Sequence, residues 1–293
     1  MTDEKDLIRE RKKKLENISE FSLAYPNKVI KSDTTRSLIN TCSNEDKKSL
    51  EEKNILTNIC GRVMTIREMG NSVFADLHDE YGKIQIYLNK KNLDEISQNM
   101  FKNLDLGDIV GISGVIFKTK TQELTINVDS FLILSKCLRP LPEKFHGIAD
   151  IEIKYRQRYL DLMTNLETRL HFKKRSKIIK ILRNYFDERD YIEVETPMMH
   201  IIPGGANAKP FITHHNSLDM NLFLRIAPEL FLKRCIIGGY EKVFEINRSF
   251  RNEGLSIKHN PEFTMIEFYS AYENYEYLMQ TIEDLFKSLI LNL

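Results

Sequence analysis

The residues best suited to chemistry gather in one short segment, residues 243–269, where two stretches of alternating residues flank a charged turn. Alternation with a period of two places every second side chain of an extended strand on the same face. One face of the first stretch carries Glu245, Asn247, Ser249 and Arg251. One face of the return stretch carries Phe263, Met265, Glu267 and Tyr269. Pairing the two stretches as a hairpin would therefore gather a guanidinium, carboxylates, a phenol and an aromatic ring on one surface.

The turn between the two stretches adds further polar groups, namely Glu253, Lys258, His259 and Asn260. Arginine can hold a phosphate through two parallel hydrogen bonds, while lysine and histidine neutralise the outer charges of a polyphosphate. The ring of Phe263 offers a face on which a flat heterocycle can stack. Together these groups fit ATP. The alternative is a hairpin decorated with ordinary solvated charges, to which an isolated R-x-x-R-N-E pattern would more often belong.

The order of parts is more specific than that pattern alone. Residues 250–269 closely resemble motif 2 of the class II aminoacyl-tRNA synthetases, in the version that activates lysine. Residues 191–199 resemble motif 1, a strand ending in a proline that helps to build the dimer interface of the family. The segments 202–216 and 224–233 are similar to the lysine-specific stretches between the two motifs. The resemblance covers roughly residues 50–280.

The resemblance implies a two-step reaction in which lysine attacks the α-phosphate of ATP, and the lysyl group then passes from lysyl-adenylate to tRNA(Lys). It implies that Arg251 is catalytic, because it would hold both the lysine carboxylate and the α-phosphate as charge develops. The positions that match the ATP site are Arg251, Glu253, Lys258, His259, Asn260 and Phe263. The positions that match the lysine site are Gly205, Glu229, Glu267 and Tyr269.

The family also carries a third motif, a Gly-rich stretch ending in an essential arginine and preceded by acidic residues that bind Mg²⁺. No such stretch occurs in residues 1–293. We therefore expect Mg²⁺ to be needed by the family but to have no ligands in this chain. The sequence is expected to correspond to the front part of such an enzyme, and its independent activity is expected to be poor.

Residues 57–138 change to short alternating strands with one helical segment, an element order typical of a five-stranded OB-fold barrel. The helical segment spans residues 93–104, with Leu93, Ile96, Met100, Phe101 and Leu104 on one face. An Asn92-x-x-Glu95 pattern is expected to cap it.

On the outer face of this barrel, alternation in residues 73–78 leaves Phe74 pointing outward beside Asp76 and His78. A nucleic-acid base stacked on such a ring contributes about 1–3 kcal/mol. The alternative is a ring covered by another domain, because solitary apolar residues on surfaces are common. The resemblance favours RNA, since Arg67, Phe74, Gln85 and Glu123 match positions that read the anticodon in the family.

We predict an α+β chain with four parts. Residues 1–56 form a helical extension, and residues 57–138 form the OB-fold anticodon-binding domain. Residues 139–150, which include Pro140 and Pro142, form a linker. Residues 151–293 form an incomplete class II catalytic domain with an antiparallel sheet and helices.

Within the last part, residues 168–188 are expected to form a long helix whose buried side contains Phe172, Ile178, Ile179, Leu182 and Phe186. Asp190 stands where the family usually has glycine, and aspartate can still adopt a left-handed turn. The helix containing residues 9–14 is basic and amphipathic, and both tRNA contact and a solvated face remain open for it.

Composition limits the possibilities further. The formal net charge is +1, so any RNA contact must come from local patches. No run approaches the ~20 apolar residues needed to cross a bilayer, and the N-terminus lacks a signal peptide, so a cytoplasmic protein without membrane contact is expected. The four cysteines are scattered and are expected to be reduced.

Three other functions remain open. An aspartyl- or asparaginyl-type synthetase would share the barrel and the motifs, but residues 203–211 argue against it. A ligase that attaches lysine to a protein would typically lack the anticodon barrel. A non-catalytic tRNA-binding module, in which the second domain only dimerises, requires an assay to be separated from an enzyme.

Overall fold

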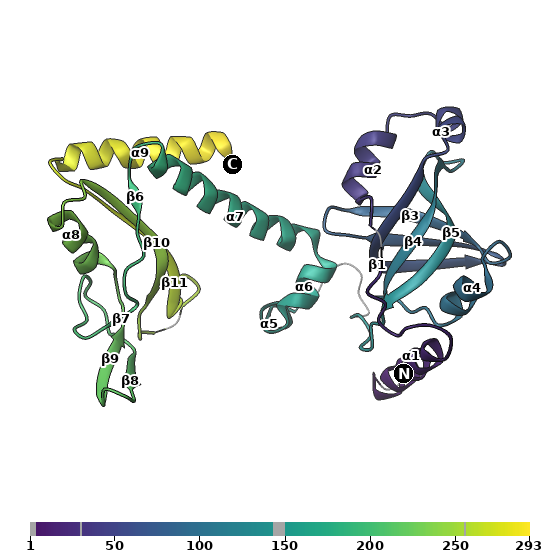
Figure 1. Cartoon of the computed structure of the whole chain (residues 1–293), viewed down its shortest axis with the longest axis horizontal. Coiled ribbons are helices and arrows are strands. Elements are labelled where there is room, and N and C mark those ends of the chain that lie inside the picture. Colours follow the sequence, from purple (N-terminus) through teal and green to yellow (C-terminus); the bar gives the residue numbers. More distant parts are fainter. Residues whose placement is uncertain (1–3, 30, 143–149, 255) are drawn as a thin grey trace. The chain divides into compact units, whose positions relative to one another are not determined.

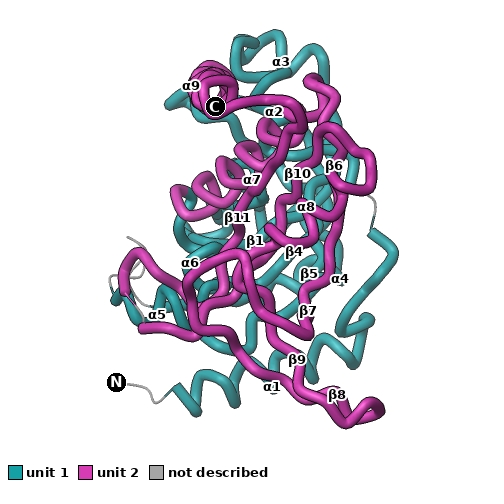
Figure 2. The backbone as a smooth tube through the Cα atoms, turned by 90° about the vertical axis from the view of Figure 1, so that its left-hand side faces the viewer, with its two compact units in different colours: residues 1–166 teal, residues 167–293 magenta. Residues whose placement is uncertain are grey.

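A computed structural model describes residues 4–29, 31–142, 150–254 and 256–293. The chain divides into two compact units, residues 1–166 and residues 167–293 (Figure 2). The linker predicted at residues 139–150 lies mostly outside the described residues. Residues 151–166 belong to the first compact unit, whereas the sequence analysis placed them in the catalytic domain.

The first unit contains a closed five-stranded barrel with the strand order β1-β2-β3-β5-β4 (Figure 1). Its elements are β1 (Leu56–Met69), β2 (Ser72–His78), β3 (Lys83–Asn89), α4 (Glu95–Lys102), β4 (Ile109–Lys118) and β5 (Leu124–Ser135). A helix between the third and fourth strands of such a barrel is the element order of an OB-fold. The predicted fold of this region is confirmed.

The alternation predicted for these strands also holds, because Val73, Ala75 and Leu77 are at most 1% exposed. The predicted helix cap was wrong. The N-cap of α4 is Asp94, whose side chain accepts a hydrogen bond from the Ser97 N–H at 2.6 Å. Ile96, expected on the buried face of this helix, is 54% exposed.

Three helices precede the barrel in the described residues: α1 (Glu4–Phe21), α2 (Thr35–Cys42) and α3 (Lys47–Lys53). They contribute Ile18, Leu38 and Leu50 to the core of the barrel. Two basic residues of α1 bind the barrel unit. The Arg11 guanidinium donates to the Cys137 carbonyl, and the Lys14 ammonium pairs with the Asp105 carboxylate at 2.7 Å. The predicted amphipathic helix is present, and part of its charge serves its packing on the barrel. Two short helices, α5 (Ile151–Arg156) and α6 (Arg158–Thr164), follow the barrel in the same unit.

The second unit contains two small sheets, with the strand orders β11-β10-β6 and β7-β9-β8. Its elements are α7 (Leu166–Asp187), β6 (Ile192–Glu193), β7 (Met199–His200), β8 (Ile212–His215), β9 (Met220–Leu224), α8 (Glu229–Ile237), β10 (Lys242–Phe250), β11 (Glu262–Ser270) and α9 (Tyr275–Asn292). The long hairpin β10–β11 is antiparallel, as predicted, whereas β6 pairs with β10 in parallel.

An aromatic core attaches the hairpin to α7 and α9. The fully buried ring of Phe186 lies 5.0 Å from the rings of Tyr191 and Phe244 and 4.8 Å from the ring of Phe268, measured between centroids. Phe172, predicted on the buried side of α7, is 46% exposed. The apolar face of the hairpin is thus committed to packing, which leaves its polar face for chemistry.

The turn before β6 is built as predicted, because Asp190 has φ of 61°, in the left-handed region. Among the helices of the described residues, none combines the length and the apolar character needed to span a bilayer.

Candidate functional site

The hairpin β10–β11 places the predicted residues on one face. Glu245 lies opposite Glu267, and Ser249 lies opposite Phe263. Residues directly opposite each other in an antiparallel pair have Cβ atoms about 4.5–5.5 Å apart and share a face. Arg251 follows the end of β10 and remains joined to the return strand, because its N–H donates to the Pro261 carbonyl at 2.8 Å.

A cavity of about 260 Å³ lies at the turn end of the hairpin. It contains every residue predicted for the ATP site: Arg251, Glu253, Lys258, His259, Asn260 and Phe263. The Arg251 guanidinium lies over the Phe263 ring, 5.1 Å from its centroid. The Nε of Arg251 is buried and has no hydrogen-bond partner. A buried donor without a partner favours a ligand that can accept its hydrogen bond.

The turn is held by residues far away in the sequence. The Asn252 N–H donates to the Lys209 carbonyl at 2.7 Å, and the Lys209 N–H donates to the Glu253 carboxylate at 3.2 Å. Farther along the turn, Ser256 and His259 exchange backbone hydrogen bonds at 3.2 Å. Lys209 lies within the stretch 202–216 that the sequence analysis singled out, so that stretch also supports the turn, which the sequence alone did not indicate.

The four residues predicted for the lysine site also lie together. Gly205 has φ of +88°, and a Cβ at this position would lie 2.9 Å from the Cβ of Glu229, too close for any side chain. The Tyr269 hydroxyl donates to the Glu267 carboxylate at 2.7 Å. Lys233 of α8 pairs with Glu229 at 2.6 Å, and its ammonium lies 6.0 Å from the Tyr269 ring centroid. Helix α8 and strand β11 thus bring two carboxylates and a phenol to one place.

The electrostatics of this cluster are unusual. Burial raises the pKa of the Glu267 carboxyl, the Tyr269 hydrogen bond lowers it, and the nearby charges of Glu229 and Glu245 raise it further. Burial and the charge of Glu267 also raise the pKa of the Tyr269 hydroxyl. Carboxylates that repel one another in a half-buried site are stabilised by a cation placed between them. The cluster is therefore suited to an ammonium group.

Beside Glu267 lies a buried ion pair that the sequence analysis missed. Arg225 and Glu245 are 0% and 1% exposed, and the Arg225 guanidinium donates to the Glu245 carboxylate at 2.6 Å. Thr196 and Asn247 also donate to the same carboxylate, at 2.7 and 3.0 Å. Arg225 lies in stretch 224–233 and Thr196 in motif 1, so both belonged to segments singled out for other reasons.

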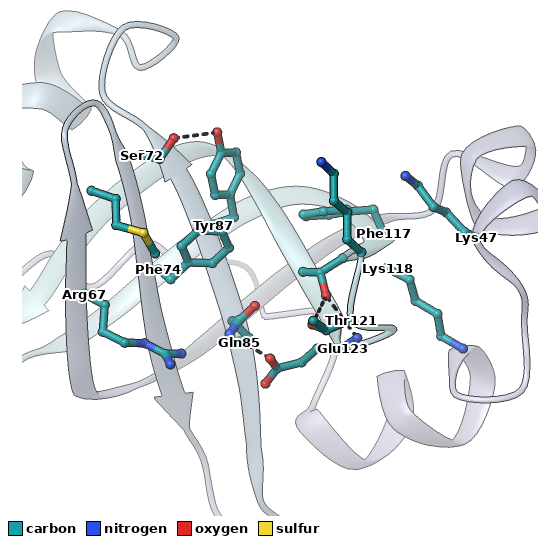
Figure 3. Close-up of a pocket in the computed structure, with 13 residues that line it drawn as sticks. Lys47, Arg67, Ser72, Phe74, Gln85, Tyr87, Phe117, Lys118, Thr121 and Glu123 are labelled. Carbon is teal, nitrogen blue, oxygen red and sulfur yellow. Dashed lines mark hydrogen bonds between the residues drawn. The ribbon is translucent and has the colours of Figure 1, made fainter.

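In the first unit, a pocket of about 730 Å³ lies on the outer face of the barrel (Figure 3). It contains all four residues predicted to read the anticodon: Arg67, Phe74, Gln85 and Glu123. The Gln85 amide donates to Glu123 at 3.0 Å and accepts from Thr125 at 3.0 Å. These two hydrogen bonds fix the orientation of the amide. Gln85 is buried, whereas a residue that reads bases would be expected to be exposed.

Two aromatic residues that sequence reasoning missed complete this pocket. The Tyr87 ring lies 5.0 Å from the Phe74 ring and 6.2 Å from the Phe117 ring, and its hydroxyl lies 3.1 Å from the Ser72 hydroxyl. The sequence analysis did not connect Tyr87 with Phe74. Because β2 and β3 pair Phe74 with Tyr87 across the strands, the register was the signal that could have revealed this.

Among the described residues, no group of three or more His, Cys, Asp or Glu side chains could hold a metal ion. The four cysteines are free.

An OB-fold barrel, together with a hairpin that carries an arginine, a stacking ring and paired carboxylates, defines the architecture of a class II aminoacyl-tRNA synthetase. Comparison with known families agrees. The family model for class II tRNA synthetases (D, K and N) matches residues 150–293, and the model for the OB-fold nucleic acid binding domain matches residues 57–134. The chain therefore contains a class II tRNA synthetase domain of the aspartate, lysine and asparagine type and an OB-fold nucleic acid binding domain.

Within this family, the chain is similar to proteins named lysine–tRNA ligase. It is 52% identical to that of Nitrosomonas europaea over 292 residues, which cover 99% of this chain and 58% of the relative. It is 54% identical to that of Thiobacillus denitrificans over 285 residues, which cover 97% of this chain and 57% of the relative. The chain thus spans somewhat more than half the length of these relatives.

Proposed function

We propose that this chain is the part of a lysine–tRNA ligase that binds the tRNA anticodon and forms one side of the ATP and lysine sites. The observation that carries the proposal is the polar face of the β10–β11 hairpin, which has the cavity around Arg251 and Phe263 at its turn end and a pair of carboxylates, Glu245 and Glu267, farther along the same face. The similarity to relatives that are named lysine–tRNA ligases supports lysine as the amino acid.

In the first step, Arg251 holds the α-phosphate of ATP and the lysine carboxylate, which brings the nucleophile and phosphorus together. Its buried Nε, which has no hydrogen-bond partner among the described residues, is available for this contact. Phe263 stacks on adenine, and Glu253 accepts from the adenine amino group. Lys258 and His259 neutralise the outer phosphates, and Asn260 orders the loop. Catalysis here depends on positioning and charge stabilisation.

Lysine is recognised by two groups of contacts. The backbone at Gly205 and the carboxylates of Glu229 and Glu267 hold the α-ammonium, and the ammonium favours the charged form of the half-buried Glu267. Tyr269 helps to select the distal ammonium. The ammonium of Lys233 pairs with Glu229 at 2.6 Å, so the substrate ammonium would share this carboxylate with Lys233. Mg²⁺ is expected for the family, but the described residues offer no cluster for it.

The barrel binds the anticodon of tRNA(Lys). A base stacks on Phe74, and Arg67, Gln85 and Glu123 contact base edges, which is how OB-folds and other single-strand binders combine affinity with specificity. Because protein synthesis uses tRNA in the cytoplasm, we place the protein there.

The proposal is tested by ATP–pyrophosphate exchange with the full-length protein that contains this chain. Exchange should depend on lysine and should be absent with aspartate or asparagine. If aspartate or asparagine supported exchange instead, that amino acid and not lysine would be the substrate. No exchange with any of the three amino acids, together with intact tRNA binding, would favour the non-catalytic tRNA-binding module.

Gln85→Ala is expected to relax the choice among anticodon bases more than it weakens binding, because base-edge contacts carry sequence information. Binding of anticodon stem-loops that differ at one base would be measured for both proteins. Thr125→Val removes a hydrogen bond that orients Gln85 without removing Gln85 itself, so it should give a smaller change in the same direction. Unchanged discrimination in Gln85→Ala would remove this residue from base recognition.

We also propose that the protein is a homodimer through the motif 1 region. Apolar residues cluster there on the surface: Ile192, Met198, Met199, Ile201 and Ile202 are 36–75% exposed. Such a patch next to an edge strand suits a two-fold interface. Sedimentation should show a dimer, and Met199→Asp with Ile202→Asp should convert it to a monomer. A wild-type monomer at micromolar concentration would contradict the proposal.

A further inference from the structure

The buried pair Arg225–Glu245 is not explained by the substrate contacts proposed above. It lies beside Glu267 of the proposed amino-acid site and joins three segments that are distant in the sequence. The Arg225 guanidinium donates to the Glu245 carboxylate at 2.6 Å, to the Thr196 hydroxyl at 3.1 Å and to the Arg248 carbonyl at 2.8 Å. The Arg225 carbonyl in turn accepts from the Phe250 N–H at 2.9 Å, one residue before Arg251.

The pair also adjoins the carboxylate cluster. Glu245 is the direct cross-strand neighbour of Glu267, on the same face of the hairpin. Two carboxylates in this arrangement repel each other. The repulsion disfavours ionisation mainly of the carboxylate that has fewer hydrogen-bond donors and cations around it. Glu245 has an arginine, a hydroxyl and an amide as donors, whereas Glu267 has only the Tyr269 hydroxyl among the described residues.

We propose that Arg225 and Glu245 form a positioning pair that keeps the Glu267 carboxylate available for the ammonium of the amino-acid substrate. The inference rests on the proposed function, because it takes an amino acid as the ligand. Arg225 offsets part of the charge of Glu245, so the pair raises the pKa of Glu267 less than an unpaired Glu245 would. Removing either partner leaves one buried charge that acts on Glu267 from close by.

The charged and titratable groups around Glu267 are few. Tyr269 is on its own strand, Glu245 with Arg225 behind it is on β10, and Glu229 and Lys233 are on α8. The Glu267 pKa is raised by burial, lowered by the Tyr269 hydrogen bond, raised by Glu229 and Glu245, and lowered by Lys233. A group with a raised pKa loses its negative charge as the pH falls, so binding of an ammonium should weaken on the acidic side.

The test is the pH dependence of kcat/KM for lysine in ATP–pyrophosphate exchange by the full-length protein. Arg225→Met leaves Glu245 as an unbalanced anion beside Glu267, so the acidic limb of the profile should move to higher pH by about one unit. Glu245→Gln leaves Arg225 as an unbalanced cation, so the limb should move to lower pH. The double variant Arg225→Met/Glu245→Gln removes both charges and should return the limb to its wild-type position.

Opposite shifts that cancel in the double variant cannot arise from loss of packing, which would weaken activity at every pH. Arg248→Met/Glu262→Gln is the matched control, because it removes an exposed ion pair from the same two strands. Its profile should be unchanged. Arg225→Lys keeps the charge and should retain the wild-type limb even if it lowers the rate.

Shifts in the same direction, no shift in either single variant, or a double variant that stays displaced would each overturn the proposal. If Arg225→Met does not fold, Glu245→Gln and the double variant still decide it through their relative positions. A wild-type protein without lysine-dependent exchange would instead reject the proposed function, so the two failures are distinguishable.

Discussion

Arg251→Ala in the full-length protein is expected to lower the rate of lysine-dependent ATP–pyrophosphate exchange by about 10²–10³-fold, the usual effect of removing one preorganised group that stabilises developing charge. The guanidinium lies in the cavity at the hairpin turn and over the Phe263 ring. Under the proposed function, removing it takes away both the contact to the α-phosphate and the contact to the lysine carboxylate. The loss should therefore appear mainly in kcat.

Arg248→Ala is the matched control for this experiment. Arg248 lies on β10, three residues before Arg251, but it is exposed and pairs with Glu262 on the return strand. An exposed ion pair contributes little to stability, so this variant should retain exchange within a few-fold of wild type. Equal losses in the two variants would mean that the hairpin was disturbed as a whole, and an Arg251→Ala protein of nearly normal activity would remove Arg251 from the reaction.

The faces of the hairpin could be predicted because they depend on local alternation. In residues 243–269 a period of two, together with the turn residues between the stretches, assigns Glu245 and Glu267 to one face and Phe244 to the other. The register of the two strands confirms that assignment. The inward residues of the barrel could be predicted for the same reason.

The Arg225–Glu245 pair could not be predicted in this way, because it brings together segments 20 residues apart along the chain and a third segment at Thr196. Nothing in the local pattern around Arg225 indicates that a charged side chain will be fully buried. Charged residues are rarely buried unless they are paired, so a sequence pattern alone assigns them to the surface.

Two smaller errors have local causes. Asn92 and Asp94 are both good N-cap residues. The capping pattern with Glu95 favoured Asn92, whereas the helix is capped two positions later, by Asp94. Phe172 was assigned to the buried side of α7 from helical spacing, but within the second unit only the C-terminal part of that helix joins the aromatic core. Periodicity indicates which side of a helix is apolar, not how much of its length is covered.

In the barrel, Phe74→Ala is expected to weaken binding of the tRNA(Lys) anticodon stem-loop by about 1–3 kcal/mol, or roughly 5–150-fold, the range for losing one base stack. Phe74 lines the pocket together with Arg67, Gln85 and Glu123 and is tilted against Tyr87. Isothermal titration with the stem-loop would measure the change. Exchange of pyrophosphate with lysine and ATP, which we assign to the second unit, should be unaffected.

Two further variants separate stacking from other effects of the substitution. Phe74→Leu retains an apolar side chain against Tyr87 but removes the aromatic face, so it should lose most of the affinity that Phe74→Ala loses. Tyr25→Ala removes an aromatic residue of the same unit that is 57% exposed and lies outside the pocket, so it should bind normally. Normal affinity in Phe74→Ala, or an equal loss in Tyr25→Ala, would show that the stem-loop does not stack on Phe74. Because a stacked base is held by the face of the ring rather than by its volume, a leucine that restored full affinity would likewise reject the stack.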